Sequence, residues 1–175
     1  MISDQNYLNW RQKLENHFIF RWFLVLFGIY SILMVYAVGI LLVTQGAVKE
    51  LVLIVISFVL ARLVINPLIF LFRKRQRPYQ KLKFIPPNSI WLFSGITEKF
   101  NSFPSDHAAS FASIAFPLLW FSPIIGIALL VVGLVNGVSR VMLGYHHVSD
   151  ILAGWLVGAF AAWITLTWLA PIIIK

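Results

Sequence analysis

The residues best suited to chemistry lie in one dodecapeptide, Ser139 to Asp150, between two long apolar runs. Ionisable groups at membrane depth cost free energy unless they are paired or hydrated, so they are functional candidates. If the chain is helical from His146 onward, His146 and Asp150 share one helix face. The carboxylate could then fix the imidazole tautomer and leave the other ring nitrogen free to attack. The alternative is a structural hydrogen bond at a helix start.

Two further groups suit phosphate chemistry. Arg140 precedes His146 by six residues, and its guanidinium offers a fork of donors for phosphate oxygens. His107 follows Pro104-Ser105-Asp106 at a predicted helix start, where amides and the helix dipole favour an anion. A second imidazole there can protonate a leaving oxygen and later activate water. Asp106 could cap the helix, position His107 or lie beside the phosphate.

The composition places these groups in a membrane protein. The chain has 175 residues, 60% hydrophobic and 11% charged, with a mean hydropathy of +0.86, far from the soluble average. We expect one domain over residues 1–175. The absence of cysteine excludes disulfides and thiolate chemistry. A net charge of +8 indicates anionic lipids or a phosphorylated substrate rather than nucleic acid. The sequence does not predict an oligomeric state.

Hydropathy predicts an all-α, polytopic transmembrane helical bundle of about five spans, with Pro67 kinking the second. An amphipathic helix over Tyr7 to Phe20 is expected to lie at the interface. The predicted spans are about Trp22 to Thr44, Leu51 to Phe72, Ala108 to Phe121, Ile124 to Val141 and Ser149 to Ile174.

Alternation of the spans places the chemistry on one membrane face. The end of the second span, the start of the third and the link between the fourth and fifth all fall there, so Arg77 can join the histidines. Within the basic run, Arg73 and Arg75 are interpreted as snorkelling, lipid-facing residues. Arg62, in mid-span, is interpreted as structural. The histidine and aspartate spacing fits no usual zinc pattern, and converging arginines suit an anion, so we expect no metal and no cofactor.

These segments resemble the type 2 phosphatidic acid phosphatase family, whose pattern is Lys-x6-Arg-Pro, Pro-Ser-Gly-His and Ser-Arg-x5-His-x3-Asp. The third block is complete from Ser139 to Asp150, and the second appears as Pro104 to His107 with aspartate in the glycine place. The first matches only at Arg77-Pro78, because Phe70 stands where lysine is expected.

The resemblance implies that His146 is the nucleophile, Asp150 its orienting partner and His107 the general acid. It implies that phosphate is held by Arg77, Arg140 and the region of Ser105 and Asp106. Lys74 or Arg73 could replace the missing lysine from a turn away.

Ser102 to His107 and Leu63 to Asn66 most resemble the bacitracin-resistance branch, which acts on undecaprenyl diphosphate. We therefore expect a phosphohistidine enzyme acting on a phosphorylated isoprenoid lipid in the bilayer. A phosphatidylglycerophosphate or phosphatidate phosphatase would use the same residues. A non-hydrolytic lipid transporter is the alternative from another class.

Two arguments give opposite predictions for the membrane face on which the site lies. Most lysines and arginines lie on the site's face, which the positive-inside bias would place in the cytoplasm. The resemblance implies the outer face of the cell membrane, and we expect that orientation because several of these charges can serve an anionic substrate.

Overall fold

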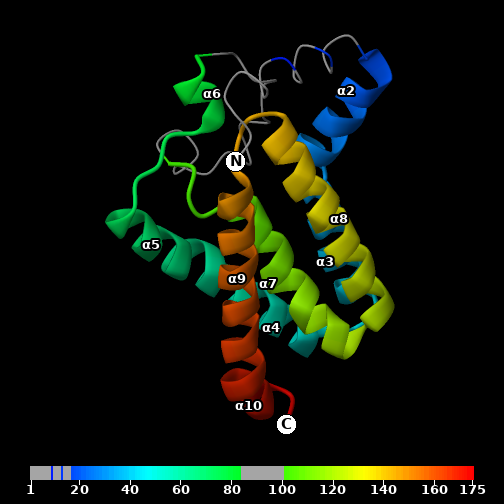
Figure 1. Cartoon of the computed structure of the whole chain (residues 1–175). Coiled ribbons are helices and arrows are strands. Elements are labelled where there is room, and N and C mark those ends of the chain that lie inside the picture. Colours follow the sequence, from blue (N-terminus) through cyan, green and yellow to red (C-terminus); the bar gives the residue numbers. More distant parts are fainter. Residues whose placement is uncertain (1–8, 10–12, 14–16, 84–100) are drawn as a thin grey trace.

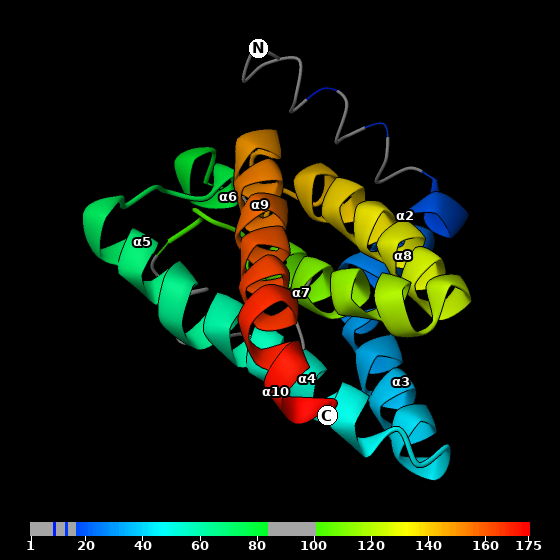
Figure 2. The same cartoon turned by 90° about the horizontal axis from the view of Figure 1, so that it is seen from below.

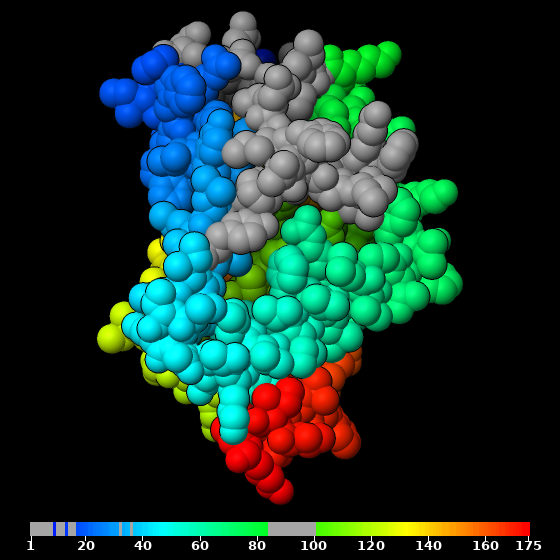
Figure 3. Space-filling model, turned by 180° about the vertical axis from the view of Figure 1, so that it is seen from behind, coloured from blue at the N-terminus to red at the C-terminus, as the bar shows by residue number. Residues whose placement is uncertain are grey.

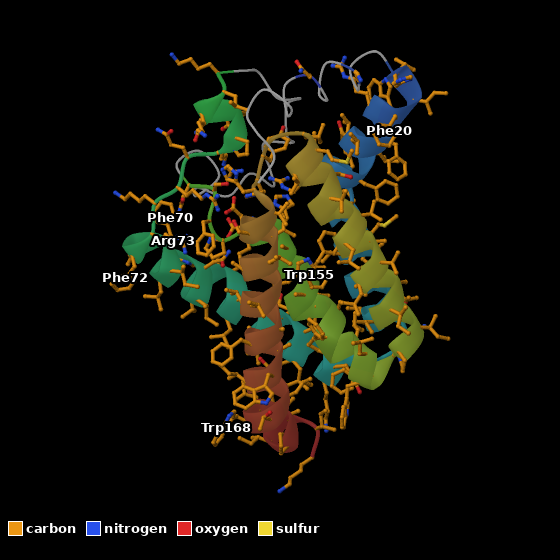
Figure 4. All side chains as sticks on the ribbon, in the orientation of Figure 1. Phe20, Phe70, Phe72, Arg73, Trp155 and Trp168 are labelled. Carbon is orange, nitrogen blue, oxygen red and sulfur yellow. The ribbon has the colours of Figure 1, made fainter. Side chains whose placement is uncertain are left out.

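The structure is a computed structural model that describes residues 9, 13, 17–83 and 101–175. Of these residues 82% are helical and none forms a strand, so the all-α prediction is confirmed. Helices far apart in the sequence pack into one bundle (Figure 1). Figure 4 shows Phe20 and Trp168 near its opposite ends, and such aromatic side chains are frequent at the two interfaces of a membrane.

The first helical segment is bent. It comprises α2 (Phe18–Val25), the π-helical η1 (Leu26–Tyr30) and α3 (Ile32–Thr44). The parts before and after Ser31 meet at 51°. The predicted interfacial helix from Tyr7 lies largely outside the described residues, and its last residues belong to α2. This segment therefore resembles a broken span rather than one straight helix.

The second segment runs without a break from Val48 to Phe72, 25 residues with a mean hydropathy of 2.5. Its parts are α4 (Val48–Val59), the π-helical η2 (Leu60–Ile65) and α5 (Asn66–Phe72). Pro67 lies inside this continuous helix, directly after the π-helical turn, and a proline there removes one backbone hydrogen bond. The irregularity expected at Pro67 therefore lies in the preceding π-helical turn, and the helix continues past the proline.

Two long helices and one short central helix complete the bundle. They are α7 (Asp106–Phe121), α8 (Pro123–Met142) and α9 (Val148–Ile164), which continues through η5 (Thr165–Leu169) and α10 (Ala170–Ile173). The short helix α6 (Pro78–Lys81) follows the basic run. Both cartoon views show α7 enclosed by α4, α8 and α9 (Figure 1 and Figure 2). Most of α7 is buried, as expected for a helix that is apolar all round.

The predicted count of about five spans is not confirmed. Among the described residues three helices are long and apolar enough to cross a membrane, or four if the bent first segment is one span. They include α8, with 20 residues, and the helix from Val148 to Ile173, with 26. Helix α7 has 16 residues, fewer than the roughly 20 that a span needs.

Glycines bring α7 and α9 unusually close together. A Cβ on Gly154 would lie 2.5 Å from the Ser105 carbonyl oxygen, and one on Gly158 would clash with the Ala109 carbonyl oxygen. Small residues permit such close approach between membrane helices. The contact places the start of α7, with His107, beside the start of α9.

Candidate active site

Backbone hydrogen bonds join three segments at one end of the bundle. The Ser102 amide donates to the Arg75 carbonyl at 2.8 Å, and the Ser105 amide donates to the Asp150 carbonyl at 3.0 Å. The Tyr79 amide donates to the Gly144 carbonyl at 3.1 Å. The structure thus brings together the three segments that alternation of the spans had placed on one face.

His146 lies at the centre of this site with 1% of its surface exposed. Its Nδ1 is 2.8 Å from the Ser102 carbonyl oxygen, which can only accept, so Nδ1 carries the proton. Its Nε2 lies 3.4 Å from an Arg77 nitrogen, which can only donate. The Nε2 lone pair is therefore directed towards a guanidinium, as a nucleophile for a bound anion requires.

Electrostatics keeps this imidazole neutral. Burial and the nearby guanidiniums of Arg77 and Arg140 hold the pKa of His146 well below its ordinary value of 6.5. The hydrogen bond to the Ser102 carbonyl opposes the shift without reversing it. A neutral imidazole is the form that can attack phosphorus.

Asp150 does not bond to His146 directly. The two side chains approach to 3.9 Å, between Nδ1 and Oδ2, too far for a hydrogen bond. The reason is local: α9 begins at Val148, and His147 precedes it with an extended backbone. His146 is therefore outside the helix, and the expected one-turn geometry does not apply.

Asp150 is fully buried and has three other partners. Its Oδ2 accepts from the Ser102 hydroxyl at 2.5 Å and from the His147 amide at 2.8 Å. The bond from the His147 amide caps the start of α9, which is the structural role that the sequence also allowed for Asp150. Its Oδ1 accepts from Arg75 at 2.7 Å. Because Ser102 bonds to His146 through its carbonyl and to Asp150 through its hydroxyl, the carboxylate reaches the imidazole through Ser102.

Arg75 corrects a sequence-based interpretation. It was expected to face lipid, but its guanidinium also donates to the Ser149 hydroxyl at 2.6 Å. Arg73 is exposed and stacks over the Phe103 ring, 4.5 Å from its centroid. Lys74 is exposed as well and does not line the cavity described below. Figure 4 shows Phe70 and Arg73 near the end of α5.

Two buried arginines flank the histidines. Arg77 donates to the carbonyls of Tyr145 at 3.1 Å and Asn101 at 2.8 Å. Arg140 donates to the Gly28 carbonyl at 3.1 Å and stacks over the Tyr145 ring at 4.8 Å. These contacts hold both guanidiniums in place before any anion arrives, which is what preorganised charge stabilisation requires.

His107 lies beside the second arginine. Its Nε2 is 3.3 Å from an Arg140 nitrogen, and Ser105 caps α7 by accepting from the Ala108 amide at 3.5 Å. Asp106 accepts from the Asn66 amide group at 2.6 Å. A cavity of about 10 Å³ opens between these groups, enough for about one water. Its lining comprises Asn66, Phe70, Arg77, Asn101, Phe103, Pro104, Asp106, His107 and His146.

The arrangement suits an anion rather than a metal. Two imidazole nitrogens face two guanidiniums, and in the described part of the chain no three His, Cys, Asp or Glu residues gather as metal ligands. Besides Arg75, three contributors were not identified as site residues from the sequence: Asn66, Asn101 and Ser102. Ser102 lies in the segment that carried the family resemblance, but its spacing from His146 and Asp150 gave no signal of contact.

Comparisons with known proteins show the family to which the chain belongs. The model of the PAP2 superfamily matches residues 50–173. Bacitracin transport permease protein BcrC of Bacillus licheniformis is 41% identical over 71 residues, 41% of this chain and 34% of that protein. Undecaprenyl-diphosphatase BcrC of Bacillus subtilis (strain 168) is 38% identical over 56 residues, 32% of this chain and 29% of that protein.

A third relative has another phosphorylated lipid in its name. Lipid A 1-phosphatase of Rhizobium johnstonii is 40% identical over 76 residues, 42% of this chain and 29% of that protein. The matched region thus spans about a third of the length of these relatives. No solved structure shows a significant match. Since the family model covers well over half of the chain, the protein belongs to the PAP2 superfamily.

Proposed function

We propose that this chain is a single-domain integral membrane phosphatase that hydrolyses undecaprenyl diphosphate to the monophosphate through a phosphohistidine. The observation that carries the proposal is His146, whose Nδ1 is fixed by a carbonyl and whose Nε2 faces Arg77. The name of the Bacillus subtilis relative supports the diphosphate substrate, and the apolar helices support a lipid one.

In the proposed first step, Nε2 of His146 attacks the terminal phosphorus. A P–N bond forms, the bridging P–O bond breaks, and the bridging oxygen keeps the electron pair. That oxygen takes a proton from His107 and leaves as the lipid monophosphate. An anionic substrate between the arginines favours the protonated form of His107 that this step needs. Arg77 and Arg140 stabilise the charge on the transferring phosphoryl group.

In the second step, water attacks the phosphorus while His107 accepts its proton. The P–N bond breaks, inorganic phosphate is released and neutral His146 is restored. Splitting the hydrolysis in this way replaces one difficult transfer with two easier ones. Fixed guanidiniums supply the positive charge that a metal would otherwise supply, so the scheme uses no metal or other cofactor.

The test is phosphate release by the purified protein in detergent, with undecaprenyl diphosphate, phosphatidate and phosphatidylglycerophosphate compared side by side in EDTA. The diphosphate should be preferred and the chelator should have no effect. His146→Ala should abolish release, whereas His147→Ala, at a partly exposed neighbour, should remain active. Preference for a glycerol lipid would support the second candidate, a phosphatidate-type phosphatase.

The first relative is named a bacitracin transport permease protein, and a non-hydrolytic lipid transporter is the candidate from another class. A transporter has no use for a nucleophile. Movement of lipid between leaflets by His146→Ala at the wild-type rate, without phosphate release by the wild type, would support that candidate instead.

We also propose that the protein lies in the cell membrane with the site on the outer face. The chain has no cysteine, so a single cysteine can report sidedness. A membrane-impermeant maleimide added to intact cells should label Lys74→Cys and not Lys49→Cys, both at exposed positions. The reverse pattern would place the site in the cytoplasm.

A further inference from the structure

Arg62 is a charged residue within an apolar helix. It belongs to the π-helical η2, within the continuous helix from Val48 to Phe72, and it is partly buried. Its guanidinium lies over the Phe58 ring, 5.7 Å from the centroid. Among the described residues no carboxylate forms an ion pair with it. An arginine at such depth is costly and is usually retained for a function, and π-helical turns are frequent at functional sites.

Arg62 lines a large apolar groove. This groove has a volume of about 570 Å³ and runs between α3 and α4, with Ile114 of α7 contributing to its wall. Arg62 is its one charged lining residue in the described part of the chain. Figure 3 views the molecule from the side where α3 and α4 lie next to each other. A groove of this kind accepts a hydrocarbon chain that carries one anionic group near Arg62.

Two helices contribute residues both to the active-site cavity and to the groove. Asn66 lines the active-site cavity and Arg62, four residues earlier, lines the groove, so about one helical turn separates them. On α7, His107 lines the cavity and Ile114 the groove, which places them on one helix face about 10 Å apart. Arg62 is also near enough to His107 for the two to interact electrostatically.

We infer that Arg62 binds the phosphate that stays on the lipid, making the protein selective for lipid diphosphates over lipid monophosphates. The inference rests on the proposed function. The terminal phosphoryl group lies between Arg77 and Arg140 and passes to His146. The second phosphate then lies at Arg62, on the side of His107, and the hydrocarbon chain follows the groove. When the bridging P–O bond breaks, the leaving phosphate gains negative charge, which Arg62 stabilises.

The experiment measures product inhibition during turnover of farnesyl diphosphate, a short-chain probe. Farnesyl phosphate tests the leaving-group position, and inorganic phosphate tests the position between Arg77 and Arg140. Arg62→Gln should raise the inhibition constant of farnesyl phosphate roughly 10- to 150-fold, as loss of a hydrogen bond to a charged group predicts. The constant for inorganic phosphate should stay unchanged. Arg21→Gln, at an exposed arginine, is the matched control and should alter neither.

Folding of the variants is checked with Arg62→Met, which removes a charge from a membrane-embedded helix and should insert at least as well as the wild type. Equal shifts for both inhibitors, no shift for either, or loss of folding in both variants would overturn the inference and make Arg62 structural. If the wild type releases no phosphate from farnesyl diphosphate, the proposed function itself fails and the inference falls with it.

Discussion

Removing the Ser102 hydroxyl should weaken catalysis while leaving the protein folded. In Ser102→Ala the carbonyl that fixes His146 Nδ1 remains, but the 2.5 Å hydrogen bond to Asp150 is lost. A hydrogen bond to a charged group contributes about 1.5–3 kcal/mol. If all of it is expressed in the transition state, kcat/KM falls roughly 10- to 150-fold. KM should change little, because Ser102 does not line the active-site cavity.

The assay is phosphate release from undecaprenyl diphosphate, with kcat and KM determined separately. The control is Ser113→Ala, which removes a buried hydroxyl bonded to the Ser110 carbonyl at 3.0 Å, within α7. That variant should retain wild-type kcat. Ser102→Thr, which keeps a hydroxyl, should recover part of the activity. Unchanged kcat in Ser102→Ala would refute the view that Asp150 acts on His146 through Ser102.

Two further predictions concern packing and protonation. Gly158→Ala should lower the melting temperature in detergent, because its Cβ would clash with the Ala109 carbonyl oxygen. Gly39→Ala should not, because a Cβ there meets nothing within 4 Å. Equal melting temperatures would contradict the close α7–α9 contact. Because burial and two guanidiniums lower the pKa of His146, histidine-selective ¹⁵N NMR should show its neutral Nδ1–H tautomer at pH 6.5. As the pH falls, the His146 imidazole takes up a proton in the unfolded chain before it does so in the folded protein, so the stability of the fold should decline below about pH 6.5. Protonation of folded His146 above pH 6.5 would contradict this.

Much of the architecture follows from hydropathy and alternation. The apolar runs predicted three of the long helices close to their observed limits. Alternation predicted that His107, Arg140 and His146 share one face, and in the structure they lie at one end of the bundle. The π-helical turns were not predictable, because they depend on which carbonyls find donors elsewhere. Asn136, for example, donates to the Phe27 carbonyl of η1 at 2.8 Å, a contact between residues more than a hundred apart.

The site differs from the prediction at residues whose partners are set by the local backbone geometry or by the tertiary fold. The spacing of His146 and Asp150 predicted a direct pair only if both were helical, and His146 lies just before the helix. Arg75 was expected to face lipid because it lies in a basic run, but its guanidinium pairs with Asp150, 75 residues away in the sequence. Such contacts are fixed by the tertiary fold, and neither spacing nor composition reveals them.

Rapid-quench labelling of His107→Ala with a radiolabelled aryl phosphate tests whether His146 is the nucleophile and His107 the general acid. An activated aryl phosphate leaves without help, so loss of the general acid should not prevent the first step. On the natural substrate the rate of the same variant should fall roughly 10²–10⁴-fold. If His146 is the nucleophile, the label should be stoichiometric and acid-labile, should turn over slowly, and should be absent when His146 is also replaced. Label that is lost in His107→Ala but retained in His146→Ala would contradict it, because the two histidines would then have the opposite roles.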